Sequence, residues 1–284
     1  MKTIQYRQAT RAELDVAVQW AQAEGWNPGQ GDADVYWATD PEGFVVLERD
    51  GEMVGSGSIV SHGGGFGFMG FYIVRPDLRG QGLGGPFWHW RKARLAKRLR
   101  PGAAIGMDGV FTMEAFYARG GFVTSHRNLR FEGVGQRGTP GSAVVDLADV
   151  PWPEVLAYDR TCFGFERATF LQAWVNRPNL RALAAVRHGQ IVGYGAVRPA
   201  STGSRIGPLF AHTPEVADAL FTGLSDQAPG QPLFLDLPDR NPAALALAQR
   251  HGMQQVCGCA RMYAGPPPAL PYAYTYGVAS LELG

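Results

Sequence analysis

The fold of this 284-residue chain is decided by the stretch Val74-Arg75-Pro76-Asp77-Leu78-Arg79-Gly80-Gln81-Gly82-Leu83-Gly84-Gly85-Pro86. A strand, 66–74, enters this turn and a helix, 87–99, leaves it. Glycine has no Cβ atom, so the backbone N–H groups of Gly80, Gly82 and Gly84 have room to gather round an anion. A helix N-terminus adds unpaired donors and a partial positive charge. The turn therefore predicts a pyrophosphate site.

Two other phosphate-binding patterns do not fit. A P-loop places Gly-Lys-Ser/Thr at the start of its helix, whereas this chain has Gly84-Gly85-Pro86 there. Gly80, Gly82 and Gly85 have dinucleotide-type spacing, but that fingerprint follows the first strand of a parallel unit and needs an acidic residue about 20 positions later. Here the turn follows a hairpin meander, and residues 91–100 are basic.

The segments around the turn predict an α/β (α+β) domain with a mixed sheet. Thr10-Arg11-Ala12-Glu13 has capping-box spacing and starts a helix that ends at Gly25. A short helix is expected at 113–119. The expected strands of this half are 4–7, 44–47, 54–60, 66–74, 103–107 and 122–131.

The turn resembles the acetyl-CoA motif of the GNAT superfamily of N-acetyltransferases, Arg/Gln-x-x-Gly-x-Gly/Ala. The stretch Ala115-Phe116-Tyr117-Ala118-Arg119-Gly120-Gly121-Phe122 is similar to a second motif of that family, with one residue fewer after its alanine. The resemblance covers the first half of the chain and implies acetyl-CoA as cosubstrate, without a metal. By this resemblance the cofactor-binding residues are Ile73, Val74, Arg79, Gly80, Gln81, Gly82, Leu83, Gly84 and Gly85.

The second half repeats the pattern of the first. Its hairpin at Gly189 matches that at Gly51, an offset of 189 − 51 = 138, and Arg261 matches Arg130, an offset of 261 − 130 = 131. The two offsets differ by 138 − 131 = 7, so the second half has seven residues fewer between these anchors. The Gly-rich turn lies in that interval and has no counterpart in the second half. Further on, Ala248 stands in place of the motif tyrosine. Helices are expected at 150–162, 169–175, 214–224 and 241–251, and strands at 180–186, 191–197, 205–210, 233–237, 256–263 and 276–283.

The whole chain resembles bacterial tandem GNAT proteins. This implies two GNAT-like domains, each a mixed, mostly antiparallel sheet flanked by helices. Residues 1–135 are expected to form the catalytic domain that binds acetyl-CoA. Residues 136–284 are expected to form a degenerate domain that shapes the acceptor site, with strands 256–263 and 276–283 closing its own sheet.

The resemblance implies direct attack of an amine on acetyl-CoA in a ternary complex. Tyr117 then protonates the departing thiolate, and backbone N–H groups around Ile73 and Val74 polarise the thioester carbonyl. The general base stays open between Glu114 and Asp108, with Glu24, Asp32 and His62 as further candidates. In the family, the connection between the first two helices borders the acceptor, which implies Trp26, Asn27 and Asp32 as substrate-binding residues; a Trp26 that packs on the first helix is the alternative.

The charge balance of the chain predicts no general partner among nucleic acids or membranes. Lys and Arg number 26 against 25 Asp and Glu, a net charge of +1. No apolar run reaches the length of a membrane span. Three cysteines without a pairing pattern suit the cytoplasm, and Cys257 and Cys259 are expected as buried strand thiols.

Three activities remain open at this point. The first is acetyl transfer to an amine of a small molecule or peptide. The second is a sensor module that binds acyl-CoA without turnover, for which a tyrosine at position 117 is dispensable. The third is transfer from another acyl-CoA or from aminoacyl-tRNA, although near-neutral charge argues against RNA binding. The identity of the amine and the oligomeric state are not readable from the residues.

Overall fold

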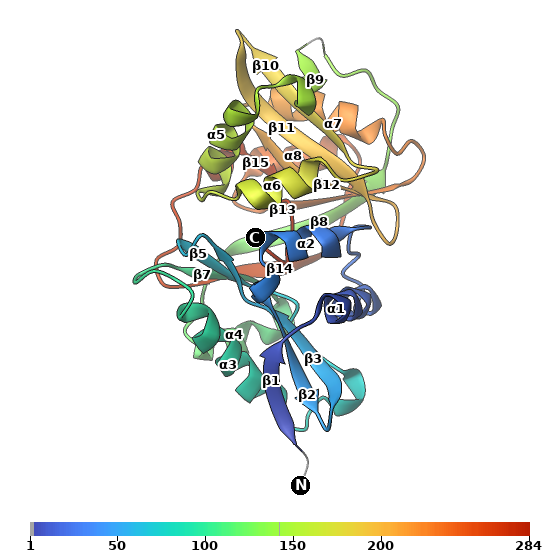
Figure 1. The fold of residues 1–284 in the computed structure, drawn as a ribbon. Helices are drawn as coiled ribbons and strands as arrows, with labels where there is room; N and C mark the ends of the chain where they lie inside the picture. The colour runs from blue at the N-terminus through green and yellow to red at the C-terminus, as the bar shows by residue number, and fades with distance from the viewer. Residues whose placement is uncertain (1–2, 142) are drawn as a thin grey trace.

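The computed structural model describes residues 3–141 and 143–284. Figure 1 shows two lobes joined by strands that run between them. The first half contains β1 (Ile4–Gln8), α1 (Arg11–Ala23), α2 (Asp32–Thr39), β2 (Phe44–Arg49), β3 (Glu52–Ser58), β4 (Val60–His62), β5 (Phe66–Met69), β6 (Ile73–Val74), α3 (Gly84–Ala96), β7 (Ile105–Val110), α4 (Glu114–Arg119) and β8 (Val123–Val134).

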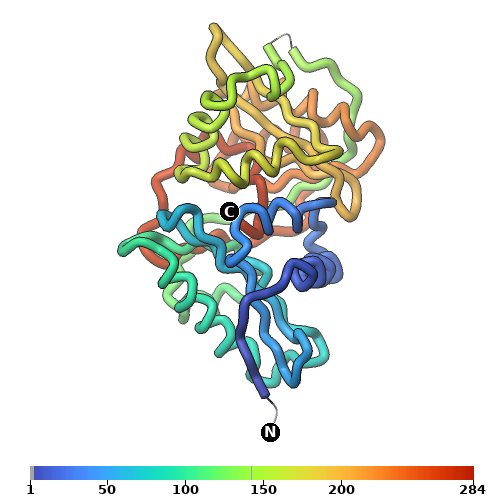
Figure 2. The backbone as a smooth tube through the Cα atoms, in the orientation of Figure 1, coloured from blue at the N-terminus to red at the C-terminus, as the bar shows by residue number. Residues whose placement is uncertain are grey.

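The second half follows the same order of elements. It contains β9 (Val144–Asp146), α5 (Trp152–Phe163), α6 (Ala168–Val175), β10 (Arg181–Arg187), β11 (Gln190–Pro199), β12 (Ser204–Ala211), α7 (Pro214–Ser225), β13 (Pro232–Pro238), α8 (Pro242–Arg250), β14 (Gln254–Ala264) and β15 (Thr275–Gly277). The mixed α/β architecture with two similar units agrees with the predicted fold class, and the tube in Figure 2 shows the chain passing between the lobes more than once.

The two halves share one sheet. Its order is β4-β5-β7-β14-β8-β13-β12-β11-β10-β9, with β15 beside β12, while β1-β2-β3-β6 form a separate four-stranded sheet. Strand β14 lies between β7 and β8 of the first half, and β8 lies between β14 and β13 of the second. The prediction that strand 256–263 closes the second unit alone is therefore wrong, because hydrogen-bond pairing joins it to strands more than 100 residues away in the chain.

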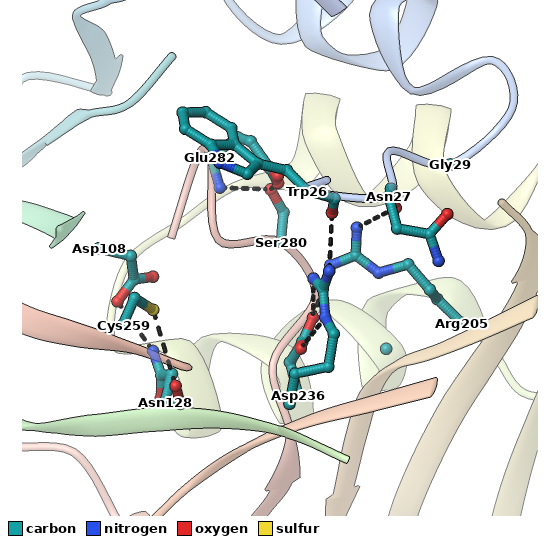
Figure 3. A network of polar contacts seen from close by, with 12 residues as sticks. Trp26, Asn27, Gly29, Asp108, Asn128, Arg205, Asp236, Cys259, Ser280 and Glu282 are labelled. Carbon is teal, nitrogen blue, oxygen red and sulfur yellow. Dashed lines mark hydrogen bonds and ion pairs between the residues drawn. The ribbon is translucent and has the colours of Figure 1, made fainter. Parts of the chain in front are cut away.

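The register of β8 and β14 reflects the internal repeat. Asn128 pairs with Cys259, and 259 − 128 = 131, the same offset that relates the two half-sequences. At this one pair, equivalent residues of the two halves face each other in the shared sheet. Figure 3 shows this pair, where the Cys259 thiol donates to the Asn128 carbonyl at 3.7 Å. Cys259 is buried as predicted, whereas Cys257 is exposed.

Buried ion pairs tie each exchanged strand to the other half. Arg130 on β8 bonds Asp236 on β13 at 2.7 Å, and Arg261 on β14 bonds Asp108 on β7 at 2.7 Å. Arg205 reaches Asp236 as well, at 2.6 Å. Burial alone raises the pKa of Asp236, but the charges of Arg130 and Arg205 outweigh burial and hold that pKa well below its usual range.

Asp236→Asn is expected to lower the free energy of unfolding by about 3–5 kcal/mol, because it leaves two buried guanidinium groups without their counter-charge. Urea denaturation of the whole chain measures the loss. Asp218→Asn is the matched control: its partner Arg250 is 52% exposed, so its loss should stay within about 1 kcal/mol. Equal small losses in both variants would contradict the importance of the cross-strand pair.

The C-terminal segment does not form the strand predicted over 276–283. Only Thr275–Gly277 is a strand, paired with β12. Residues 278–284, called here the tail, instead run onto the first half, where the Ser58 hydroxyl donates to the Glu282 carbonyl at 3.4 Å. The tail shares a core cluster with α1 and α2, on the opposite side of the first-half sheets from α3 and α4.

His62 lies beneath the tail and makes a pH-dependent contact. Its Nε2 is 3.0 Å from the Leu283 carbonyl, and burial lowers the pKa of the ring to about 4. Because the unfolded chain takes up the proton near pH 6.5, this residue's contribution to stability is present above that pH and is lost as pH falls towards 4.

His62→Gln is expected to reduce the acid sensitivity of the fold. The wild-type contribution of this ring falls by about 2 kcal/mol between pH 7 and pH 5, and the variant lacks that loss while keeping an N–H donor for Leu283. Unfolding free energies at the two pH values measure the difference. His188→Gln, an exposed hairpin residue, should keep the wild-type dependence. If the unfolding free energy of His62→Gln changes with pH as much as that of the wild type, His62 is not the source of the acid sensitivity.

Candidate active site

The first-half sheet splits at Gly70 and Phe71. The predicted single strand 66–74 is two strands: β5 pairs with β7 in parallel, and β6 pairs only with β3. Phe71 has a φ of +49°, a left-handed conformation that breaks the ladder. Ser58 holds the break by accepting from the Gly70 N–H at 2.7 Å, and Ser56 donates to the Phe71 carbonyl at 2.9 Å. As a result, the sheets separate between β6 and the end of β7.

Arg91 supports this break from the side of α3. Its side chain is fully buried, and its Nη2 donates to the carbonyls of Gly70 at 2.6 Å and Ser58 at 2.8 Å. A Cβ atom at position 57 would lie 2.1 Å from Arg91 Nε, so Gly57 makes room for it. Burial lowers the pKa of Arg91 to about 10. The sequence interpretation missed this residue, although an arginine between Phe87 and Leu95 at helical spacing was a visible signal.

The Gly-rich turn lies at the start of α3, which begins three residues earlier than predicted. Gly80 and Gly82 have φ values of +76° and +77°, and a Cβ on either would meet open space. Among the described residues, no hydrogen bond uses the N–H groups of positions 80–85, and Leu83 at the N-cap makes no side-chain cap bond. The turn therefore presents unpaired donors towards open space, as an anion site requires.

The side chains of the turn are held from both flanks. Arg79 donates through Nε to the Val74 carbonyl at 2.9 Å and pairs with Glu24 through Nη2. Gln81 donates to the Asp77 carbonyl at 3.3 Å and accepts from Arg49 at 3.2 Å. These contacts fix the turn between β6 and α3. They also engage Glu24, one of the base candidates, in an ion pair away from the sheet break.

Tyr117 lies on α4 beneath the turn and beside the break. Its ring stacks on Trp88 at 6.1 Å between centroids and fills the space above Gly109, where a Cβ would be 2.6 Å from the ring. Burial raises the pKa of Tyr117 to about 12, so the phenol keeps its proton at neutral pH. No hydrogen bond between described residues uses its hydroxyl. Tyr72 lies next to the start of α3: a Cβ atom at position 84 would be 2.5 Å from the Tyr72 hydroxyl.

The two main base candidates are differently placed. Asp108 is bound by Arg261 through both carboxylate oxygens and accepts from Asn128 Nδ2 at 2.9 Å. Burial raises the pKa of Asp108 against the opposing charge of Arg261, but both carboxylate oxygens already accept from that guanidinium group, so Asp108 is engaged in an ion pair and is not free to take a substrate proton. Glu114 is half-buried and accepts from the Thr124 hydroxyl at 2.5 Å. His62 is committed to the tail.

The predicted acceptor loop is fastened to the second half. Asp32 is fully buried, bonded to Arg177 at 2.6 Å and Arg198 at 3.1 Å, so its predicted contact with substrate is not supported by its position. Asn27 exchanges side-chain bonds with Thr202. Trp26 remains half-buried over the core cluster that contains α1 and the tail, and its carbonyl accepts from Arg130 at 2.7 Å. Figure 3 shows Trp26 and Asn27 meeting the central ion pairs.

The residues that the structure describes contain no group of three or more His, Cys, Asp or Glu side chains arranged to hold a metal ion. They also contain no helix long and apolar enough to span a bilayer.

The chain is similar to acyltransferases over nearly its whole length. Residues 11–90 match the model "Acetyltransferase (GNAT) family", and residues 155–277 match "Acetyltransferase (GNAT) domain". The holothin acyltransferase of Pseudoalteromonas sp. (strain SANK 73390) is 29% identical over 278 residues, 97% of this chain and 93% of that protein.

Solved structures share the fold across both halves. A putative acetyltransferase from Pyrococcus horikoshii superposes with a TM-score of 0.84 at 23% identity, covering 99% of this chain and 96% of that one. A tandem GNAT protein from the clavulanic acid biosynthesis pathway superposes with a TM-score of 0.64 at 15% identity, covering 93% and 100%.

Proposed function

The chain belongs to the GNAT acyltransferases with two tandem GNAT domains, and on that premise we propose that it transfers an acetyl group from acetyl-CoA to an amine. The acceptor is a primary amine of a small molecule or peptide, which attacks the thioester directly in a ternary complex. The observation that carries the proposal is the set of unpaired N–H groups at 80–85, in front of an uncapped helix and next to the break between β6 and β7.

The residues fit the cosubstrate from one end to the other. The open turn suits the pyrophosphate, because unpaired amides and the α3 N-terminus favour negative charge. The edge of β6 that faces away from β3 pairs with no described strand, although Arg79 bonds its Val74 carbonyl, and the backbone at Ile73 and Val74 suits the amide-containing arm and the thioester carbonyl. Tyr117 holds a proton within the same face of the fold and supplies it to the leaving sulfur.

We also propose that residues 1–135 carry the acetyl-CoA site and that residues 136–284 act as a non-catalytic domain. In the second half, α7 begins with Thr213, whose side chain accepts from the Val216 N–H, so this helix N-terminus is already capped. Ala248 stands where the first half has its phenol. The second half supports the acceptor loop through Arg177, Arg198 and Arg205.

A thiol-release assay with acetyl-CoA and a panel of primary amines tests the proposal. We expect release of free CoA that depends on the amine and forms the acetylated product. Replacing acetyl-CoA by longer acyl-CoA molecules separates acetyl transfer from transfer of another acyl group. Tight binding of acetyl-CoA without turnover on any amine would favour the sensor interpretation and would contradict the proposed activity.

A further inference from the structure

Glu282 differs from the other buried carboxylates of the chain. Each of the others has an arginine within ion-pair distance; these residues are Asp32, Asp40, Asp108, Asp159 and Asp236. Glu282 is 4% exposed, and among the described residues it forms no ion pair. Its Oε2 accepts from Ser280 at 2.7 Å and from Tyr36 at 3.2 Å, whereas no hydrogen bond between described residues uses Oε1.

The tail brings Glu282 to the sheet break. A Cβ on Gly70 would lie 2.4 Å from the Glu282 carbonyl oxygen, and Ser58 contacts the same atom. This is the face opposite Tyr117, since Glu282 meets α2 through Tyr36 while Tyr117 packs with α3. Figure 3 shows Glu282 and Ser280 in one view with Trp26 and Asp108. The carboxylate therefore stands across the break from the residue that protonates sulfur.

The charges around Glu282 do not neutralise it. Burial and, to a smaller degree, the charge of Glu282 raise the pKa of Asp108, which places the two carboxylates within electrostatic reach of each other. Of the cations near this site, Arg130 is paired with Asp236, and the buried Arg91 donates to the Gly70 and Ser58 carbonyls of the break. Because Oε2 alone bonds to described side chains, Oε1 keeps its capacity to accept from a donor outside the chain, and an ammonium group is such a donor.

We propose that Glu282 binds the ammonium group of the acceptor and takes its first proton, an inference that rests on the proposed function. The acceptor nitrogen then attacks the thioester carbonyl carbon, the new C–N bond forms and the C–S bond breaks. The ammonium loses two protons in all. One proton passes through Glu282 to water. Tyr117 donates its hydroxyl proton to the sulfur, and the second proton from the nitrogen restores that hydroxyl. The products are therefore an amide, free CoA and one released proton.

Glu282→Gln in the full chain tests this assignment. The amide keeps the size of the side chain and can still accept from Tyr36 and Ser280, but it neither attracts a cation nor takes a proton. We expect kcat/KM for the amine to fall about 10²–10⁴-fold, with acetyl-CoA affinity within about twofold of wild type. Glu282→Asp restores a carboxylate and should recover part of the loss. Glu215→Gln, on the exposed start of α7, is the matched control and should leave both quantities unchanged.

The thermal midpoint separates this role from a structural one without using activity. Removing an unpaired buried charge should leave the midpoint unchanged or raise it. A lower midpoint in Glu282→Gln, or kcat/KM within about threefold of wild type, would overturn the assignment. If the wild type releases no thiol with any amine, the proposed function fails, and the midpoint still decides whether Glu282 is an unpaired charge.

Discussion

Gly82→Asp is expected to lower the affinity of the chain for CoA by at least about 100-fold. The φ of Gly82 is +77°, which a side chain adopts only with strain, and the new carboxylate stands before the uncapped N-terminus of α3. The aspartate carboxylate, one residue before the N-cap Leu83, is attracted to the same unpaired N–H groups that a pyrophosphate needs, and its negative charge repels that anion. Loss of two charge-assisted bonds, each worth about 1.5 kcal/mol or more, corresponds to this change.

Calorimetric titration of CoA into the two proteins measures the effect. Gly189→Asp is the matched control: Gly189 has a φ of +74° and open surroundings, but it belongs to the second-half hairpin. That variant suffers the same backbone strain and gains the same charge, and it should bind CoA like wild type. Unchanged affinity in Gly82→Asp would mean that the turn does not hold the pyrophosphate.

Tyr117→Phe is expected to lower kcat by about 10²–10⁴-fold while leaving acetyl-CoA affinity within about twofold. The substitution removes the proton donor but keeps the ring that packs on Trp88 and over Gly109. Since the pKa of Tyr117 is about 12, the wild-type phenol remains protonated up to about pH 10, and its ionisation should cause no alkaline loss of activity below that pH.

Steady-state thiol release at saturating acetyl-CoA measures this loss. Tyr158→Phe serves as the control, because Tyr158 is also a buried phenol but donates to the Val192 carbonyl in the second half. Its kcat should stay within about threefold of wild type. A comparable kcat in Tyr117→Phe would assign the proton to another donor.

The parts of the site that depend on local geometry were predictable from the sequence. Gly80 and Gly82 signal positive φ because few other residues tolerate it, and Pro86 with its neighbours signals a helix start. Tyr117 was identified through a short motif on one helix. The capping box at Thr10 and Glu13 is present as expected, because both of its bonds are formed within four residues.

The parts that depend on long-range pairing were not predictable. Alternation of apolar residues in β14 indicates a strand but not its neighbours, so nothing local placed it between β7 and β8. Asp108 looks like a free carboxylate until Arg261 lies beside it, 153 residues later in the chain. One signal was available: Arg130 and Arg261 occupy equivalent positions in the two halves, 131 residues apart, which is consistent with similar roles for the two side chains.

Glu282 shows the same limit most clearly. A glutamate in an apolar C-terminal stretch carries no motif, and the segment was interpreted as a strand of the second half. The position of Glu282 follows from the path of the tail, which crosses to the first half. There Ser58 and Tyr36 contact Glu282, and His62 contacts the neighbouring Leu283. Only the pairing of every other buried carboxylate with an arginine distinguishes it.

A crystal structure of the chain with bound CoA would show where the diphosphate binds. We expect pyrophosphate oxygens within hydrogen-bond distance of the N–H groups at 80–85, with the thiol end entering the break between β6 and β7 near Tyr117. Density for the diphosphate at any other place, with the turn and α3 N-terminus free of ligand, would contradict this expectation.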